Sequence, residues 1–209
     1  MTITEDQPKR ARNARGEGTK LRQEILEATE SLLETLPVEK VTLRGIAREA
    51  GVAAPSIYRH FSDLDAILRA LVVVAFDDLT AELSRAQSGT RPSSRLRQSC
   101  AAYLAFAESQ PQRYRLLFGG VWNAAEAAPA SPEEYAARRE IGMNALGVIA
   151  TTLAECVEAG ESTSPDPSAD ATALWVAMHG LAELRRTTPM FPWPEALDDR
   201  LIDTVARLR

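Results

Sequence analysis

Apolar side chains recur at helical spacing along most of the 209-residue chain, and no stretch alternates as a half-buried strand would. Over residues 20–35 they fall on one helical face, with Thr19 as a cap before that helix and Pro37 as a stop after it. The same spacing predicts further helices at 43–50, 54–60, 63–85, 92–108, 111–119, 131–159, 167–187 and 194–208. We therefore expect an all-α fold of about nine helices, with Ser62 as the cap of the helix over 63–85.

Composition is that of an ordinary globular protein, with 45% hydrophobic and 25% charged residues. The net charge of −5 hides an uneven distribution, because residues 9–22 carry six basic side chains against Glu17 alone. Residues 1–18 lack periodicity, so we expect a flexible basic arm there. A basic arm on an acidic body favours local binding of a polyanion rather than binding over the whole surface.

Cysteine usage and hydropathy bear on the compartment. Cys100 and Cys156 form no CxxC pair, and we interpret them as small buried residues in a reducing environment. The first 18 residues lack the apolar core of a secretory signal. The longest apolar run, over 66–76, is interrupted by Arg69 and is shorter than the ~20 residues that span a bilayer. The sequence therefore predicts a cytoplasmic protein without a membrane partner.

The stretch "TLRGIAREAGVAAPSIYRHF" (42–61) predicts a helix-turn-helix. Ala47 and Ala50 let two short helices approach closely, and Gly51 permits the sharp bend between them. Ile57 is apolar where the third helix packs on the core. The expected organisation is a flexible arm over 1–18, a three-helix domain that carries the helix-turn-helix over 19–65 and a larger helical domain over 66–209, for which the resemblance described below implies a regulatory and dimerisation role.

The outer face of the third helix carries side chains that suit DNA, namely Ala54, Pro55, Ser56, Tyr58, Arg59 and His60. An α-helix fits the major groove, and small residues at its start allow close approach to base edges. Arg59 can meet guanine or a phosphate, while Tyr58 and His60 can donate to phosphate oxygens. The alternative is that these residues complete a small core. We accept it for Ile57 and Phe61, but three large polar-tipped side chains in a row are unusual in a core.

The longer stretch "TLRGIAREAGVAAPSIYRHFSDLDAIL" (42–68) resembles the DNA-binding signature of the TetR family of tetracycline-repressor-like regulators. The signature positions are Thr42, Ile46, Ala47, Ala50, Gly51, Val52, Tyr58, His60 and Phe61. The resemblance implies a double-stranded DNA operator. Its bases would be faced by Arg44, Ala54, Pro55, Ser56 and Arg59, and its phosphates would be held by Tyr58 and His60.

Two positions depart from the family pattern. The family often has Ser or Thr where Ala53 stands, as the cap of the recognition helix, and Lys where Leu64 stands, as a phosphate contact. Leu64 cannot hold a phosphate, so we expect docking to rely more on Arg44 and the basic arm.

Residues 103–119 and 174–184 resemble a subgroup whose C-terminal domain is named for a Trp-His-Gly element, here Trp175, His179 and Gly180. The resemblance implies a homodimer through the last two helices, within residues 167–208. It also implies a pocket among the helices of 92–187 for a small apolar or aromatic ligand. The candidate lining residues are Tyr103, Phe106, Phe118, Trp122, Met143, Trp175 and Met178. Each of them, taken singly, is also typical of a helical core.

His179 and Glu183 lie four residues apart and could together hold a metal ion. We favour a structural His179 that is hydrogen-bonded to a neighbouring helix, and we expect no metal and no cofactor. The sequence shows no phosphate-binding glycine loop, nucleophile elbow or paired-carboxylate site.

These observations predict a homodimeric, ligand-responsive repressor with two recognition helices on a near-palindromic operator. A ligand would pivot the helix over 63–85 and change the separation of the two recognition helices. Two alternatives stay open, a regulator that responds to a protein partner and a helical enzyme with a site among Cys100, Trp122 and His179. The lack of any activating constellation argues against the enzyme.

Overall fold

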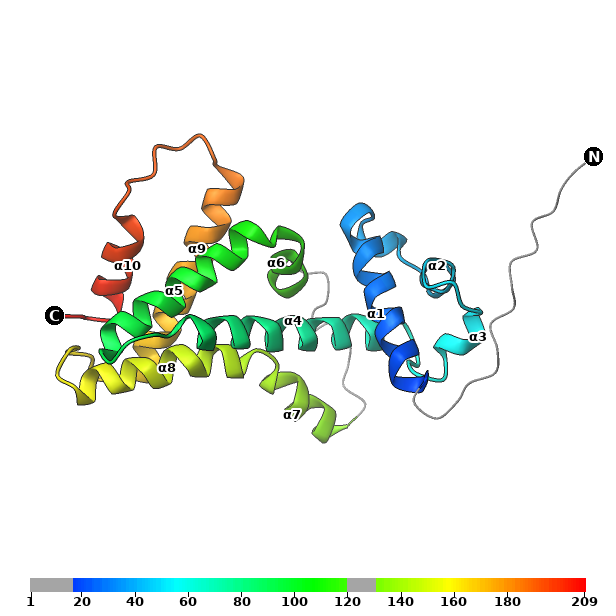
Figure 1. The fold of residues 1–209 in the computed structure, drawn as a ribbon, viewed down its shortest axis with the longest axis horizontal. Coiled ribbons are helices and arrows are strands. Elements are labelled where there is room, and N and C mark those ends of the chain that lie inside the picture. The colour runs from blue at the N-terminus through cyan, green and yellow to red at the C-terminus, as the bar shows by residue number, and fades with distance from the viewer. Residues whose placement is uncertain (1–16, 120–130) are drawn as a thin grey trace, which may run out of the picture. The chain divides into compact units, whose positions relative to one another are not determined.

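A computed structural model describes residues 17–119 and 131–209, and every regular element in these residues is helical (Figure 1). The all-α fold class is thereby confirmed. The chain divides into two compact units, residues 1–67 and 68–209. The elements are α1 (Glu17–Thr35), the 3₁₀-helix η1 (Val38–Lys40), α2 (Leu43–Glu49), α3 (Ala54–Ile57), α4 (Leu64–Ala86), α5 (Pro92–Ser109), α6 (Pro111–Phe118), α7 (Pro132–Glu140), α8 (Met143–Glu158), α9 (Pro167–Thr187) and α10 (Leu197–Val205).

The N-terminal unit is built from α1, α2 and α3 and ends in the first turn of α4. Helix α1 packs against α2, and α2 packs against α3. Ile25, Ile46, Ile57 and Ile67 are fully buried in its core. At roughly 1.5–3 kcal/mol for each such side chain, this burial stabilises helices that are too short to form alone in water.

Two helix starts differ from the sequence prediction. Helix α1 begins at Glu17, so Thr19 lies inside the helix and does not cap it. The cap of α4 is Asp63, whose Oδ1 accepts a hydrogen bond from the Ala66 backbone N–H at 2.8 Å. Ser62 instead donates its hydroxyl to Asp63 Oδ2 at 2.9 Å. A carboxylate is the stronger acceptor and is favoured by the helix dipole, which explains why Asp63 takes the position.

In the C-terminal unit α5, α8 and α9 pack against one another, and α10 covers α9 and α5. Its core is built around Leu96, Leu153 and Leu174, one from each of the three central helices, and all three are fully buried. Cys100 and Cys156 are free thiols buried in the same core, as the sequence predicts. Burial raises the pKa of Cys100 to about 12 and that of Cys156 to about 11, so both thiols stay protonated near neutral pH.

The single helix predicted over 131–159 is wrong, because α7 ends at Glu140 and α8 begins at Met143. Gly142 has a φ of +84°, in the left-handed region that favours glycine. A Cβ atom at this position would lie 2.9 Å from Cε1 of Phe76 on α4. The break therefore exists where the chain turns sharply and lets an aromatic ring from another helix approach the backbone.

Helix α10 covers less than the predicted 194–208, and its apolar face packs on the unit's own core. Ile202 and Ala206 are buried, and Val205 is partly buried against the same cluster. The hydroxyl of Ser162 donates to the Ala206 carbonyl at 2.7 Å, which ties the chain end to the segment before α9. Leu197, Leu201 and Leu208 are likewise only partly buried against this core, so the dimer role expected of this segment stays a prediction.

Among residues 17–119 and 131–209, no single helix is both long enough and apolar enough to cross a bilayer. Residues Pro132–Arg138 and Met143–Glu158, bent by 52° at the break, meet the length and composition criteria only as a pair. The apolar face of α8, with Ile149 and Leu153, is buried in the core of the C-terminal unit.

Candidate nucleic-acid interface

The turn between α2 and α3 has the conformation that the sequence predicts. Thr42 starts α2, and its hydroxyl oxygen accepts a hydrogen bond from the Gly45 N–H at 3.1 Å. Gly51 has a φ of +65°, where an ordinary side chain would be strained. Pro55 lies in the first turn of α3, and Ala53, at the cap position, makes no side-chain hydrogen bond. The turn is thus specified by glycine, and the recognition helix lacks the usual cap.

Helix α3 is shorter than predicted, because it spans Ala54–Ile57 and continues over 58–60 only as a turn. Its inward side is apolar, with Ile57 and Phe61 buried. The predicted DNA-binding residues lie outside this core. Pro55, Tyr58, Arg59 and Arg44 are exposed, and Ala54, Ser56 and His60 are half-buried. We call these seven residues the reading surface.

The large polar side chains of the reading surface serve no purpose within the fold. In the part of the chain that the structure describes, Arg44, Tyr58, Arg59 and His60 have no side-chain hydrogen bond or ion pair. Tyr58 is 61% exposed. Guanidinium, phenol and imidazole donors on one surface are the groups that contact phosphates and base edges. The reading surface therefore carries hydrogen-bond donors that suit a polyanion.

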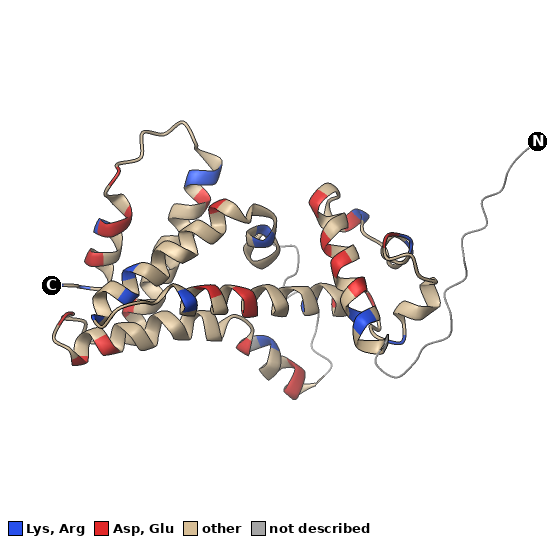
Figure 2. Ribbon diagram, in the orientation of Figure 1, with Lys and Arg blue, Asp and Glu red and all other residues tan. Residues whose placement is uncertain are grey.

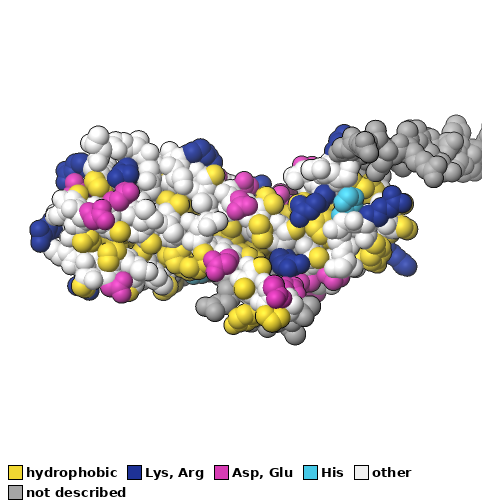
Figure 3. Space-filling model, turned by 90° about the horizontal axis from the view of Figure 1, so that it is seen from below, with side chains coloured by type: hydrophobic (Ala, Val, Ile, Leu, Met, Phe, Trp, Pro, Cys, Tyr) yellow, Lys and Arg dark blue, Asp and Glu magenta, His cyan; other side chains and the backbone are white. Residues whose placement is uncertain are grey.

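The start of α1 lies next to the reading surface. The flexible arm expected over 1–18 includes Gly18, so the sequence does not predict this proximity. A Cβ atom at Gly18 would lie 3.8 Å from Cε1 of His60. Arg22 lies over the Phe61 ring, with its guanidinium carbon 5.1 Å from the centroid. Acidic residues recur along the whole of α1, whereas its two basic residues, Lys20 and Arg22, both lie near its start (Figure 2). Figure 3 shows basic side chains on either side of a histidine on this unit.

The start of α4 provides no cation next to the reading surface. Leu64 is half-buried, and Asp63 uses a carboxylate oxygen as the helix cap. A phosphate contact at this place is therefore not supported by the side chains present, as expected from Leu64. The expected replacement of this contact by Arg44 and the basic arm stays a prediction.

The predicted ligand-lining residues occupy different environments in the C-terminal unit. Tyr103, Phe106 and Met178 are buried, Phe118 and Trp175 are half-buried, Met143 is exposed, and Trp122 lies outside the described residues. Met143 starts α8 at the break after α7, which explains its exposure.

Phe118 joins several of these residues in an aromatic cluster, consisting of Phe76, Tyr103, Tyr114, Phe118, Trp175 and His179. Its ring centroid lies 5.7 Å from that of Phe76 and 4.9 Å from that of His179. Edge and tilted contacts of this kind are typical of a packed core. The contacts agree with the core alternative, and a ligand-lining role for these residues stays a prediction.

His179 has the structural role that we favour from the sequence. Its Nδ1 lies 2.6 Å from the Tyr114 hydroxyl of α6, and burial raises the pKa of that phenol. Glu183 is paired with Arg186, and hydrogen bonds from that guanidinium hold the pKa of the carboxyl low. Within the described ranges, no three His, Cys, Asp or Glu side chains are grouped so that they could bind a metal ion.

Two family models match the chain and together cover most of it. Residues 25–71 match the model described as bacterial regulatory proteins of the tetR family, and residues 96–208 match a tetracyclin repressor-like C-terminal domain. The second match does not test the Trp-His-Gly subgroup, which stays a prediction.

Individual relatives point the same way. An uncharacterised HTH-type transcriptional regulator of Mycobacterium tuberculosis is 25% identical over 173 residues, which are 81% of this chain and 72% of the relative. A Rhodococcus protein of unknown function has a TM-score of 0.71 at 29% identity, covering 89% of this chain and 91% of its own.

FadR of Bacillus subtilis, solved in complex with stearoyl-CoA, has a TM-score of 0.68 at 14% identity, with 88% and 97% covered. At that identity the likeness shows the fold alone. Together with the family models, the helix-turn-helix geometry and the unpaired donors of the reading surface give one conclusion. The chain belongs to the TetR family of bacterial regulatory proteins, and it is a DNA-binding transcriptional regulator.

Proposed function

We propose that this regulator is a ligand-responsive repressor that binds a near-palindromic operator as a homodimer. One observation carries the proposal, namely the reading surface with four polar side chains that the fold itself does not use. Arg44 and Arg59 would contact base edges or phosphates, and Tyr58 and His60 would donate to phosphates. The basic start of α1 would add contacts to the same backbone, in place of the cation that Leu64 cannot supply.

The dimer contact is proposed within residues 167–208, with α9 as its main element. Val176 and Leu184, two helical turns apart, are 63% and 51% exposed although both are large and apolar. Burial of these two side chains against a second chain would remove apolar surface from water and favour the contact. Helix α10 would add its partly buried residues Leu197, Leu201 and Val205 to this contact.

Ligand response is proposed for the C-terminal unit, in which α4 continues as far as Ala86. The FadR structure supports this only in showing that the fold accommodates a bound ligand. A ligand that favours one position of α4 would move the recognition helices and weaken operator binding. We further propose a cytoplasmic location, and membership of the Trp-His-Gly subgroup on Trp175, His179 and Gly180.

A second candidate is a regulator that responds to a protein partner. It is favoured by Met190 and Phe191, two exposed large apolar side chains in the segment between α9 and α10. Such side chains suit a contact with another protein as well as with a second copy of this chain. Release of the operator by a small molecule alone would decide for the first candidate.

Genomic footprinting of the full-length protein, followed by operator titration, tests the proposal. Two protected half-sites about 34–36 Å apart would indicate two recognition helices in successive major grooves. The double variant Arg59→Ala/Tyr58→Phe should then lose roughly 10- to 100-fold in operator affinity, since a base contact from arginine contributes about 1–3 kcal/mol. Its sequence preference should relax at the contacted position.

The matched control is Arg115→Ala, which removes an exposed arginine from α6, outside both the reading surface and the proposed dimer contact. Operator affinity should stay within about twofold of the parent, because a single exposed charge outside the binding surface contributes little. Unchanged affinity and specificity in the double variant would refute the reading surface.

A further inference from the structure

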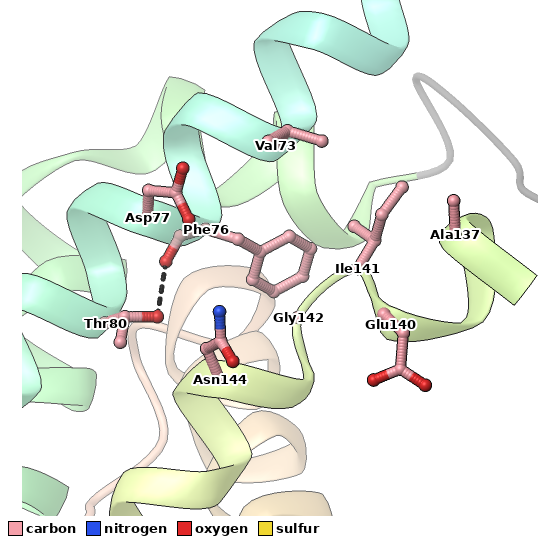
Figure 4. A pocket seen from close by; sticks show the side chains of 9 residues that line it. All are labelled: Val73, Phe76, Asp77, Thr80, Ala137, Glu140, Ile141, Gly142 and Asn144. Atoms are coloured by element: carbon pink, nitrogen blue, oxygen red, sulfur yellow. Dashed lines mark hydrogen bonds between the residues drawn. The ribbon is translucent and has the colours of Figure 1, made fainter.

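A pocket of about 200 Å³ lies in the C-terminal unit between α4 and the break that joins α7 to α8. Figure 4 shows the Phe76 ring in the middle of this site, with Asp77 on the α4 side and Glu140 at the end of α7. Val73, Ile141 and Asn144 complete the part of the wall that the argument uses. None of the six sequence-predicted ligand residues that the structure describes lines it.

The pocket exists because of the break in the helix pair. Gly142, with its φ of +84°, brings the backbone close to the edge of the Phe76 ring, where a Cβ atom would come within 2.9 Å. A continuous helix over 131–159 could not turn in this way. The sequence feature that creates the pocket is thus a glycine that allows the chain to reverse direction against an aromatic ring.

The polar groups of the pocket have one sign of charge. Asp77 and Glu140 are its charged lining residues, and no Lys or Arg lies among the described residues that form the wall. Neither carboxylate has a hydrogen bond or ion pair with another described residue, and the same holds for the Asn144 amide. The nearby Thr80 hydroxyl, in contrast, donates to the Phe76 carbonyl at 2.7 Å.

A pocket wall that contains an aromatic ring and two carboxylates attracts a cation, electrostatically through the carboxylates and through the ring quadrupole. Val73 and Ile141 supply apolar wall for the body of a ligand. The volume is below the about 300–1,000 Å³ of pockets for drug-sized ligands, so the ligand is compact. A bare metal ion fits less well, because no group of three metal-ligating side chains occurs in the described residues.

We propose that this pocket is the effector site and that it takes a compact organic ammonium ion with an apolar or aromatic body. The proposal rests on the ligand-responsive function proposed above and names the ligand class for it. Phe76 and Asp77 belong to α4, and the Phe76 ring also contacts Phe118 at 5.7 Å. A cation bound in this pocket would therefore contact α4 directly and would contact the aromatic cluster through the Phe76 ring.

Isothermal titration calorimetry of the full-length protein without DNA tests the ligand class. The probes are protonated 3-phenylpropylamine, the neutral 3-phenylpropan-1-ol and the anionic 3-phenylpropanoate, which share one aromatic body. The amine should bind saturably and about tenfold more tightly than the alcohol, and the carboxylate should bind least. Equal affinity for the amine and the alcohol would overturn the proposal.

Two kinds of variant assign the binding to this pocket. Asp77→Asn/Glu140→Gln should lower amine affinity about tenfold, the sum of two partly screened charge contacts, and leave alcohol affinity unchanged. The control Asp199→Asn/Glu108→Gln removes two exposed carboxylates on α10 and α5 and should bind the amine as the parent does.

Ala137→Phe, at an exposed lining position, should block all probes by filling the space. Circular dichroism verifies that each variant is folded, and equal amine affinity in both double variants would refute the assignment.

The effector role has its own measurement. Saturating amine should weaken operator binding by the parent protein and not by Asp77→Asn/Glu140→Gln at the same concentration. Amine that binds without changing operator affinity would overturn the effector role. Absence of any operator binding would instead refute the proposed function, while the calorimetry would still decide the pocket's ligand.

Discussion

Each of the two histidines of the chain has a tyrosine and a phenylalanine nearby, in sequence for His60 and in space for His179, but their surroundings are opposite. His60 follows Tyr58 and precedes Phe61 in the N-terminal unit, and its ring has no hydrogen-bond partner among the described residues. His179 lies against Tyr114 and Phe118 in the C-terminal unit, and its Nδ1 is 2.6 Å from the Tyr114 hydroxyl. The same residue types thus make a surface in one unit and a core in the other.

This difference separates side chains that the fold needs for its stability from exposed side chains that it does not need. Tyr114 is buried and its hydroxyl is satisfied, as buried polar groups must be. Tyr58 is exposed and its hydroxyl is unused by the fold. Removing the first kind should cost stability, whereas removing the second kind should cost binding alone.

The largest effect is expected for Leu153→Ala in the core of the C-terminal unit. Leu153 is fully buried among α5, α8 and α9, so truncation leaves a cavity and should lower the free energy of unfolding by about 2–5 kcal/mol. Urea unfolding followed by tryptophan fluorescence measures this, since all three tryptophans of the chain lie beyond residue 120.

Tyr58→Ala is the counterpart in the N-terminal unit. Its free energy of unfolding should stay within about 0.5 kcal/mol of the parent, as for most exposed positions, while operator affinity falls. Equal destabilisation by the two substitutions would contradict the division into a displayed surface and a required core.

Effects that range up to the same size are expected at two glycines that share one backbone conformation and differ in surroundings. Gly51 and Gly142 have φ values of +65° and +84°, but only Gly142 has a neighbour, the Phe76 ring, within 4 Å of a built Cβ atom. Gly51→Ala should cost about 1–2 kcal/mol of backbone strain. Gly142→Ala should cost about 1–3 kcal/mol more, because Phe76 must also move.

Asparagine tolerates the left-handed region, so Gly51→Asn is the control and should recover part of the loss at that site. Chemical denaturation followed by circular dichroism compares the three variants. Equal losses in the free energy of unfolding for Gly51→Ala and Gly142→Ala would show that the Phe76 side chain moves without cost. The glycine at the helix break would then be required by backbone conformation alone.

These glycines also show what the sequence can predict. Gly51 is recognisable because it stands between two short helical patterns, and its role depends only on the local backbone. Gly142 lies inside an apolar helical pattern, and its reason for being glycine is Phe76, 66 positions earlier in the chain. The helix-turn-helix and the all-α class therefore follow from local spacing, whereas the α7–α8 break and its pocket depend on a distant contact.

The same limit applies to helix caps and to α10. Ser62 and Asp63 are both good caps, and the choice between them depends on which oxygen reaches the Ala66 N–H. The apolar face of α10 is evident from its spacing, but spacing does not tell whether the same chain or a second copy covers it. Exposure of α3 side chains could be predicted, because polar tips on an outer helical face remain in water.

The smallest effect is expected for Glu161→Gln. This substitution weakens a polar contact in the C-terminal unit, whereas the large polar side chains of the reading surface make no such contact with described residues. Hydrogen bonds from Ser93 and then from Arg91 lower the pKa of the Glu161 carboxyl to about 2, and the Ser93 backbone N–H donates at 2.9 Å. Because the folded pKa lies below the unfolded value of about 4.3, the charged carboxylate stabilises the fold above that value. This stabilisation is lost as the pH falls toward 2.

The melting temperature of Glu161→Gln should therefore lie below that of the parent at pH 7, and the difference should shrink between about pH 4.3 and pH 2. Glu158→Gln is the control, since Glu158 is exposed on α8 and has no hydrogen bond with a described residue. Its substitution should not lower the melting temperature at pH 7. Differential scanning calorimetry across this range decides the matter. A difference in melting temperature between Glu161→Gln and the parent that stays constant down to pH 2 would mean that the Ser93 contact stabilises the start of α5 through packing and not through the charge of the carboxylate.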